Sequence, residues 1–164
     1  MNNNIRKLTV SALVMAVYIV LMYFTQSVAF GAYQIRIATA MYALAYIFPF
    51  LMIPMGLSNF IANFFFGGLG IIDMMGGFGV GVVTTAFIVL IRKYKISSWA
   101  IIVPIILVPG LLVPAWLSYL LHLPYSMLVV NVLIGQTVPA VVGALMIRTL
   151  ESRLRSVFSM AMFK

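Results

Sequence analysis

The chain has few of the residues on which metalloproteins and most enzymes depend. Its 164 residues include no cysteine, one histidine and two acidic residues. The lack of cysteine excludes disulfide bonds and thiolate metal sites, and one histidine with two acids supplies too few ligands for a conventional zinc or di-iron centre. We therefore expect neither a metal nor a cofactor.

Charge is also scarce, at 7% of residues, whereas 65% are hydrophobic. Such a chain cannot cover itself with a soluble surface and is an integral membrane protein. The apolar runs are continuous instead of alternating with a period of two, which favours α-helices over a β-barrel. The fold class expected is an all-α bundle of six transmembrane helices in one domain, with helices at about 8–28, 37–53, 57–70, 75–91, 98–121 and 126–147.

One of these runs is too short to cross a bilayer upright. A membrane-spanning helix needs about 20 residues, and the run 57–70 falls short of this length. We expect it to be tilted, broken or buried between its neighbours.

The net charge of +8 reflects membrane orientation and not a nucleic-acid site. All but one of the basic residues fall on one side of a six-helix model, namely Arg6, Lys7, Arg92, Lys93, Lys95, Arg148, Arg153, Arg155 and Lys164. The positive-inside rule makes that side cytoplasmic, with both termini inside. The tail 148–164 is expected to be a basic amphipathic helix on the inner leaflet, or alternatively a contact for an ATPase complex. The exception, Arg36, either has a function or snorkels to the lipid headgroups.

Asp73 is the acid that stands out, because its neighbourhood from Gly67 to Gly77 is otherwise apolar and rich in glycine. An unpaired acid at the bilayer centre costs roughly 2.5 to 3.5 kcal/mol, so intramembrane acids face a cavity, a partner or the interface. We favour a ligand-binding carboxylate. The alternative is an N-cap for the helix that follows.

Other polar and aromatic residues cluster toward the predicted outer ends of the helices. Asn59 and Asn63 are four residues apart and share one helix face. Taken singly, each such residue is typical of helix packing or of an interfacial aromatic belt. Together they predict a pocket for a small planar heterocycle. The candidate ligand-binding residues are Gln34, Arg36, Asn59, Asn63, Asp73, Trp116, Tyr119, His122, Asn131 and Gln136.

The first predicted helix carries a patch of small residues near its cytoplasmic end. Ala12 and Ala16 lie one turn apart, shortly after the basic pair Arg6 and Lys7. Small residues at this spacing let two helices approach closely. The patch is either a docking surface for a partner or a site of internal packing.

The motifs together resemble a known family. The segments Gln34-Ile35-Arg36-Ile37, 56–63 (Gly-Leu-Ser-Asn-Phe-Ile-Ala-Asn) and 69–73 (Leu-Gly-Ile-Ile-Asp) are similar to those of the queuosine-precursor (QueT) type of S-component, the substrate-binding subunit of energy-coupling factor (ECF) transporters. The resemblance covers residues 6–147 and implies that Arg36, Asn63 and Asp73 lie at or near the pocket. The chain departs from the family pattern at Thr39 and Gln136, where the pattern has acids, and this leaves the substrate open.

The resemblance implies a transport role that depends on partners. The chain has no G-x-x-x-x-G-K-[ST] phosphate loop and so cannot hydrolyse ATP itself. It is expected to bind a 7-deazaguanine-type molecule from outside and to present it to a transmembrane T subunit driven by two ATPase subunits. The expected location is the plasma membrane of a prokaryotic cell, crossed several times.

Two alternatives remain from the sequence. One is an S-component for a different vitamin-like substrate, and the other is a structural or channel-forming membrane protein whose polar residues serve only packing. An enzyme is not expected, since Glu151 lies beyond the last predicted helix and cannot pair with Asp73 in a catalytic dyad.

Overall fold

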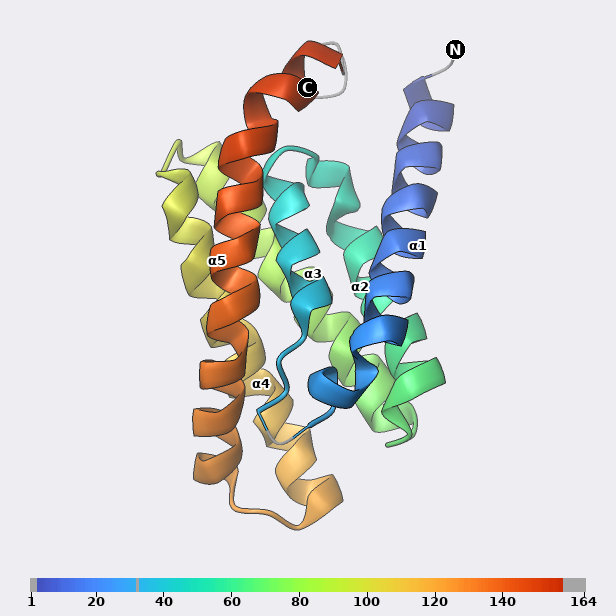
Figure 1. Ribbon diagram of the computed structural model, residues 1–164, viewed down its shortest axis with the longest axis vertical. Coiled ribbons are helices and arrows are strands. Elements are labelled where there is room, and N and C mark those ends of the chain that lie inside the picture. Colours follow the sequence, from blue (N-terminus) through green and yellow to red (C-terminus); the bar gives the residue numbers. More distant parts are fainter. Residues whose placement is uncertain (1–2, 32, 158–164) are drawn as a thin grey trace.

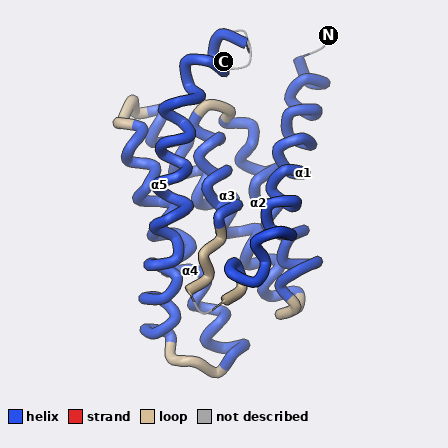
Figure 2. The backbone as a smooth tube through the Cα atoms, in the orientation of Figure 1, coloured by secondary structure: helices blue, strands red, loops and turns tan. Residues whose placement is uncertain are grey.

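The computed structural model describes residues 3–31 and 33–157, with side chains described up to Leu150. This part of the chain consists of helices joined by short loops and contains no strand (Figures 1 and 2). The longer helices are α1 (Asn3–Ala29), α2 (Met52–Ala62), α3 (Ile71–Lys93), α4 (Ile102–Leu121) and α5 (Tyr125–Val157). Four short helical segments connect them: η1 (Ile37–Tyr46), η2 (Pro49–Leu51), η3 (Asn63–Gly67) and η4 (Ser98–Ile101).

Five helical segments are long and apolar enough to cross a membrane. They are Asn3–Ala29, Pro49–Gly67, Ile71–Lys93, Ser98–Leu121 and Tyr125–Leu150. The prediction of an all-α multi-pass membrane protein is confirmed. The prediction of six spanning helices is not, because the sixth apolar helix, η1, has only ten residues.

The boundary between the second and third predicted helices lies earlier than expected, at Phe48 and Pro49. A residue before proline is pushed out of the helical region, and Phe48 accordingly has φ −120° and ψ 82°. Pro49 then begins the next helical segment, where its missing N–H costs nothing. The predicted run 37–53 is thus divided, and the short run predicted at 57–70 becomes the longer segment Pro49–Gly67.

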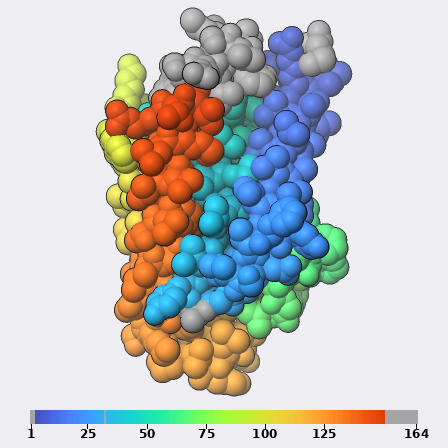
Figure 3. Space-filling model, in the orientation of Figure 1, coloured from blue at the N-terminus to red at the C-terminus, as the bar shows by residue number. Residues whose placement is uncertain are grey.

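The η1 segment is a buried 3₁₀ helix. Its ten residues rise about 20 Å, against a hydrocarbon core about 30 Å thick. On the face shown in Figure 3, η1 lies between α1 and α5. Its far end is fixed by Arg92 of α3, whose Nη1 donates to the carbonyl oxygens of Tyr46 (2.9 Å) and Ile47 (2.6 Å). These bonds satisfy carbonyls that the end of a helix leaves free.

Glycines allow the close helix contacts that hold the site in place. A Cβ on Gly81 of α3 would lie 2.8 Å from the Cα of Gly56 on α2. A Cβ on Gly143 of α5 would lie 2.9 Å from the carbonyl oxygen of Ala40 on η1. Both contacts bring backbones together in the way that small residues permit in membrane bundles.

The two ends of the bundle differ in charge. The start of α1, the connection between α3 and η4 and the end of α5 lie at one end of the molecule (Figure 1). The segments carry the basic residues Arg6, Lys7, Arg92, Lys93, Lys95 and Arg148. The orientation of this end toward the cytoplasm remains a prediction from the positive-inside rule. The predicted tail begins as a continuation of α5 to Val157, and residues 158–164, including Lys164, lie outside the described residues.

Candidate functional site

Arg36 lies inside the protein, at the N-cap of η1. Its side chain is 5% exposed, and its Nη1 donates to the Oδ1 atoms of Asn59 and Asn63, each at 3.1 Å. The guanidinium carbon lies 4.7 Å from the centre of the Phe30 ring, in a cation–π arrangement. Snorkelling is therefore the wrong interpretation of Arg36, because its charged group is bound within the protein.

The two asparagines of α2 and η3 hold the arginine and connect it to α3. Being one turn apart, they present both Oδ1 atoms to Arg36 and direct both amide nitrogens elsewhere. Asn63 Nδ2 donates to the backbone carbonyl of Asp73 at 2.9 Å. Asn59 Nδ2 lies 2.9 Å from both the carbonyl oxygen of Gly77 and the hydroxyl oxygen of Tyr42. Three segments of the chain are thereby fixed around one cation.

Asp73 is buried in the first turn of α3, with 2% of its side chain exposed. Its Oδ1 accepts a hydrogen bond of 2.9 Å from Trp116 Nε1 on α4. The N-cap of α3 is Gly70, and no side chain caps the helix, so the N-cap interpretation of Asp73 is wrong. The positive end of the helix dipole still favours a carboxylate at this position.

The other carboxylate oxygen, Asp73 Oδ2, is buried and has no hydrogen-bond partner. A Cβ on Gly67 would lie 2.9 Å from it, so the glycine leaves room beside the oxygen. Arg36 Nε is likewise buried without a partner. Among the described residues, Asn63 connects the guanidinium of Arg36 to the backbone carbonyl of Asp73, and no direct ion pair joins the guanidinium to the carboxylate. An unmade hydrogen bond on a buried group costs about 1–3 kcal/mol, so each of these two atoms is a candidate contact for a bound ligand.

A second group of hydrogen bonds joins η1 to α5 beside this cluster. Thr39 Oγ1 lies 2.9 Å from Gln136 Oε1 and 2.7 Å from the carbonyl oxygen of Arg36. Gln136 Nε2 donates to the backbone carbonyl of Gln34 at 3.4 Å. Thr39 and Gln136 are therefore in direct contact and form a neutral pair.

Comparison with families of known proteins gives a match that covers most of the chain. A family model described as QueT transporter matches residues 8–152. The chain belongs to the QueT transporter family. No curated protein and no solved structure matches the chain. Membership of a transporter family assigns the chain a transport role in a membrane, as the resemblance predicted.

In this QueT family member, the side chains of six of the ten predicted site residues take part in the hydrogen bonds described above. Gln34 takes part through its backbone carbonyl. The six are Arg36, Asn59, Asn63, Asp73, Trp116 and Gln136. The other three do not join them. Tyr119 and His122 are exposed at the end of α4, and Asn131 of α5 is half-buried and makes no side-chain hydrogen bond to the described residues. Their role in ligand binding stays a prediction.

Two aromatic residues of the site were not identified from the sequence. Tyr42 is fully buried on η1, its hydroxyl binds Asn59, and its ring stacks on Tyr18 of α1 with centroids 6.0 Å apart. Phe30 covers the guanidinium of Arg36. A tyrosine within an apolar run is itself a signal, because a buried hydroxyl needs a partner.

The alanine patch of α1 faces outward in this QueT family member. Ala12 and Ala16 are both exposed, whereas Ser11 and Tyr18 turn into the bundle. The patch therefore leaves its small side chains accessible along the outer face of α1.

Proposed function

We propose that this QueT family member is the substrate-binding S-component of an ECF-type importer in the plasma membrane of a prokaryotic cell. It takes up a small planar heterocycle of the 7-deazaguanine type from outside. The observation that carries the proposal is the pair of unpartnered buried atoms, Asp73 Oδ2 and Arg36 Nε, within one hydrogen-bonded cluster. One atom is an acceptor and the other a donor, so together they suit a ligand edge that offers both.

The chemistry of a 7-deazaguanine matches these two atoms. Its pyrimidinone edge carries N–H donors next to a carbonyl oxygen. Asp73 Oδ2 accepts from the N–H groups, and Arg36 Nε donates to the carbonyl. The ring of Trp116 and that of Phe30, which lie at Asp73 and Arg36 respectively, supply aromatic surface for a planar ligand.

Access to the cluster requires a movement, because Arg36, Asn59, Asn63 and Asp73 are all at most 5% exposed. Trp116 is the half-buried member of the cluster and binds the carboxylate directly. We expect the ligand to displace or reorient the indole as it binds. The indole then reports on occupancy of the site.

Transport further requires partner subunits. The exposed alanine patch of α1 suits close docking of a transmembrane T subunit, and two ATPase subunits supply the energy. The basic end of the bundle, where α1 begins, faces the cytoplasm in this arrangement.

A different vitamin-like heterocycle is the second candidate ligand, and the Thr39–Gln136 pair favours it. Acids at these positions would accept from exocyclic amino groups, whereas the neutral pair binds itself. A ligand with fewer amino groups fits a site with fewer acids.

The proposal is tested by ligand-induced fluorescence change in the purified protein. Trp99 and Trp116 are the two tryptophans. Trp99→Phe leaves Trp116 as the single reporter, and Trp116→Phe leaves Trp99 as the matched control. The panel contains queuine, its 7-deazaguanine precursors and common vitamins. We expect saturable quenching by one of the 7-deazaguanines in Trp99→Phe and none in Trp116→Phe.

Other outcomes separate the alternatives. Saturation by another vitamin supports the second candidate and overturns the substrate assignment. If no compound gives saturable quenching and isothermal calorimetry of the unmodified protein also detects no binding, the chain is a structural or channel protein and the proposal fails.

A further inference from the structure

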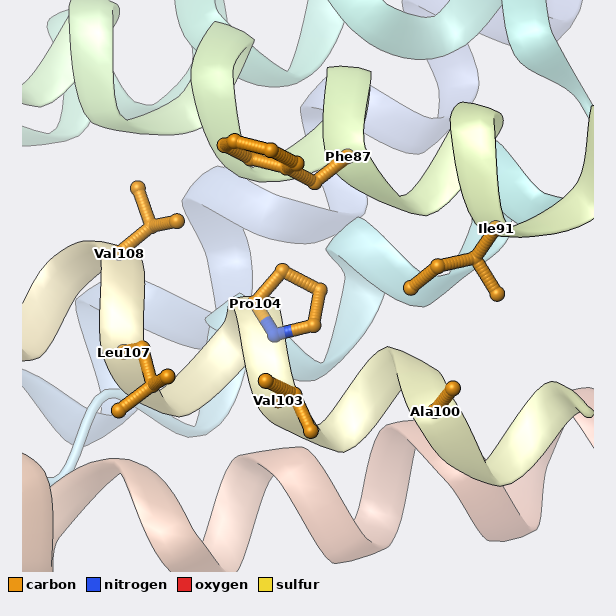
Figure 4. Close-up of a pocket in the computed structure, with 7 residues that line it drawn as sticks. All are labelled: Phe87, Ile91, Ala100, Val103, Pro104, Leu107 and Val108. Carbon is orange, nitrogen blue, oxygen red and sulfur yellow. The ribbon is translucent and has the colours of Figure 1, made fainter. Parts of the chain in front are cut away.

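An apolar groove runs along the outside of the bundle between α3 and α4 (Figure 4). Its α3 wall is formed by Val83, Phe87 and Ile91, which are four residues apart and lie on one helix face. The opposite wall extends from Ala100 on η4 to Leu112 on α4. Two stretches of about 390 and 250 Å³ share Phe87, so they form one continuous groove.

The groove has the length and the chemistry of a site for a hydrocarbon chain. At about 1.5 Å per residue, its walls extend roughly 12 Å along α3 and roughly 18 Å along η4 and α4. Every residue that lines it is apolar. A polar solute would find no hydrogen-bond partner there, whereas an acyl chain would fill it with favourable apolar contacts.

One end of the groove is positively charged. The connection between α3 and η4 joins the two walls and therefore closes the groove at that end. It carries the exposed Lys95, four residues after Ile91 and five before Ala100, and Lys93 is exposed at the end of α3. Arg92 Nη1 is bound to carbonyl oxygens at the end of η1, so we assign the headgroup contact to the two exposed lysines.

Aromatic residues mark the same end as a membrane interface. Tyr94 is 70% exposed and Trp99 is 42% exposed. The guanidinium carbon of Arg148 lies 5.1 Å from the centre of the Trp99 ring, so α5 adds a further cation there. Amphipathic aromatic rings with basic residues are typical of the headgroup level of a bilayer.

We infer that this groove binds one acyl chain of an anionic phospholipid whose phosphate lies against Lys93 and Lys95. The apolar walls select a lipid tail, and the lysines select a headgroup of net negative charge over a zwitterionic one. The site lies on the outer face of α3 and α4 and involves none of the residues of the Arg36–Asp73 cluster. It is therefore independent of the substrate proposed above.

The headgroup part is tested by native mass spectrometry of the protein with phosphatidylglycerol and phosphatidylcholine of identical acyl chains. We expect the protein to retain phosphatidylglycerol preferentially. Lys93→Gln/Lys95→Gln should lower that preference about fivefold for each lysine. The matched control is Arg6→Gln/Lys7→Gln, which removes the same charge from the start of α1 and should leave the preference within twofold.

The tail part is tested with a bulky residue in the groove. Val103 lines the groove and is 55% exposed, and Val142 of α5 is 44% exposed outside it. Val103→Trp should lose the retained phosphatidylglycerol, whereas Val142→Trp should keep it. If Lys93→Gln/Lys95→Gln and Arg6→Gln/Lys7→Gln lower the preference for phosphatidylglycerol equally, the protein holds only non-specific annular lipid and the inference is overturned. Full retention of phosphatidylglycerol by Val103→Trp would also overturn it. If Val103→Trp does not fold, the exposed Lys93→Gln/Lys95→Gln variant still decides the question.

Discussion

Replacing Asp73 with asparagine separates ligand binding from stability, because the two carboxylate oxygens have different surroundings. Oδ1 accepts from Trp116, and Oδ2 has no partner. The amide keeps an acceptor for Trp116 and removes the charge. In the ligand complex, however, it places an N–H₂ group where an acceptor is needed. We expect the substitution to weaken ligand binding strongly and to leave the fold intact.

The magnitudes follow from the hydrogen bonds. A bond to a charged group contributes about 1.5–3 kcal/mol, so its loss lowers ligand affinity on the order of tenfold to a hundredfold. In the free protein, the bond from Trp116 weakens by about 1 kcal/mol when its acceptor becomes neutral. Burying a charge at the bilayer centre costs roughly 2.5–3.5 kcal/mol, and the substitution removes this cost, which offsets the weaker bond. The free energy of unfolding should therefore fall by no more than about 1 kcal/mol.

Both quantities are measured on the same purified variant, by ligand titration and by thermal unfolding in detergent. Trp116→Phe is the matched control, since it removes the donor of the same hydrogen bond. Both carboxylate oxygens of Asp73 are then without a hydrogen-bond partner. That variant should lose more stability than Asp73→Asn. Unchanged affinity together with a loss of more than about 2 kcal/mol in Asp73→Asn would refute the reasoning and make Asp73 a structural residue.

Three further predictions concern packing, topology and coupling. Gly81→Ala should destabilise the bundle by about 1–3 kcal/mol, because the added Cβ would lie 2.8 Å from the backbone of α2. The control Gly79→Ala should not destabilise it, because a Cβ there would have no atom within 4 Å. Thermal unfolding of the two variants measures the difference. In intact cells, Tyr33→Cys should react with an impermeant thiol reagent and Tyr94→Cys should not; the reverse would contradict the proposed orientation. Ala12→Trp should abolish co-purification with the T subunit and keep ligand binding, and an intact complex would assign the patch no docking role.

The sequence alone determined the class of the protein and much of the list of residues at the site. A composition with 65% hydrophobic and 7% charged residues leaves only a membrane fold. Arg36, Asn63 and Asp73 stood out because polar groups are costly in an apolar chain, and that cost acts at each residue regardless of what surrounds it. The break at Pro49 was missed in the predicted run 37–53, although proline restricts the residue before it.

Only the tertiary structure decided which of those residues meet. Arg36, Asn59 and Asp73 lie on three different segments, and their contacts depend on close helix approach at Gly77, where a Cβ would lie 2.6 Å from Asn63 Nδ2. Apolar periodicity places a residue on a face but does not fix the register between two helices. For this reason the sequence also grouped His122 with the site, although that residue is exposed at the end of α4. The unpartnered oxygen of Asp73 likewise became visible only once every neighbouring donor had a position.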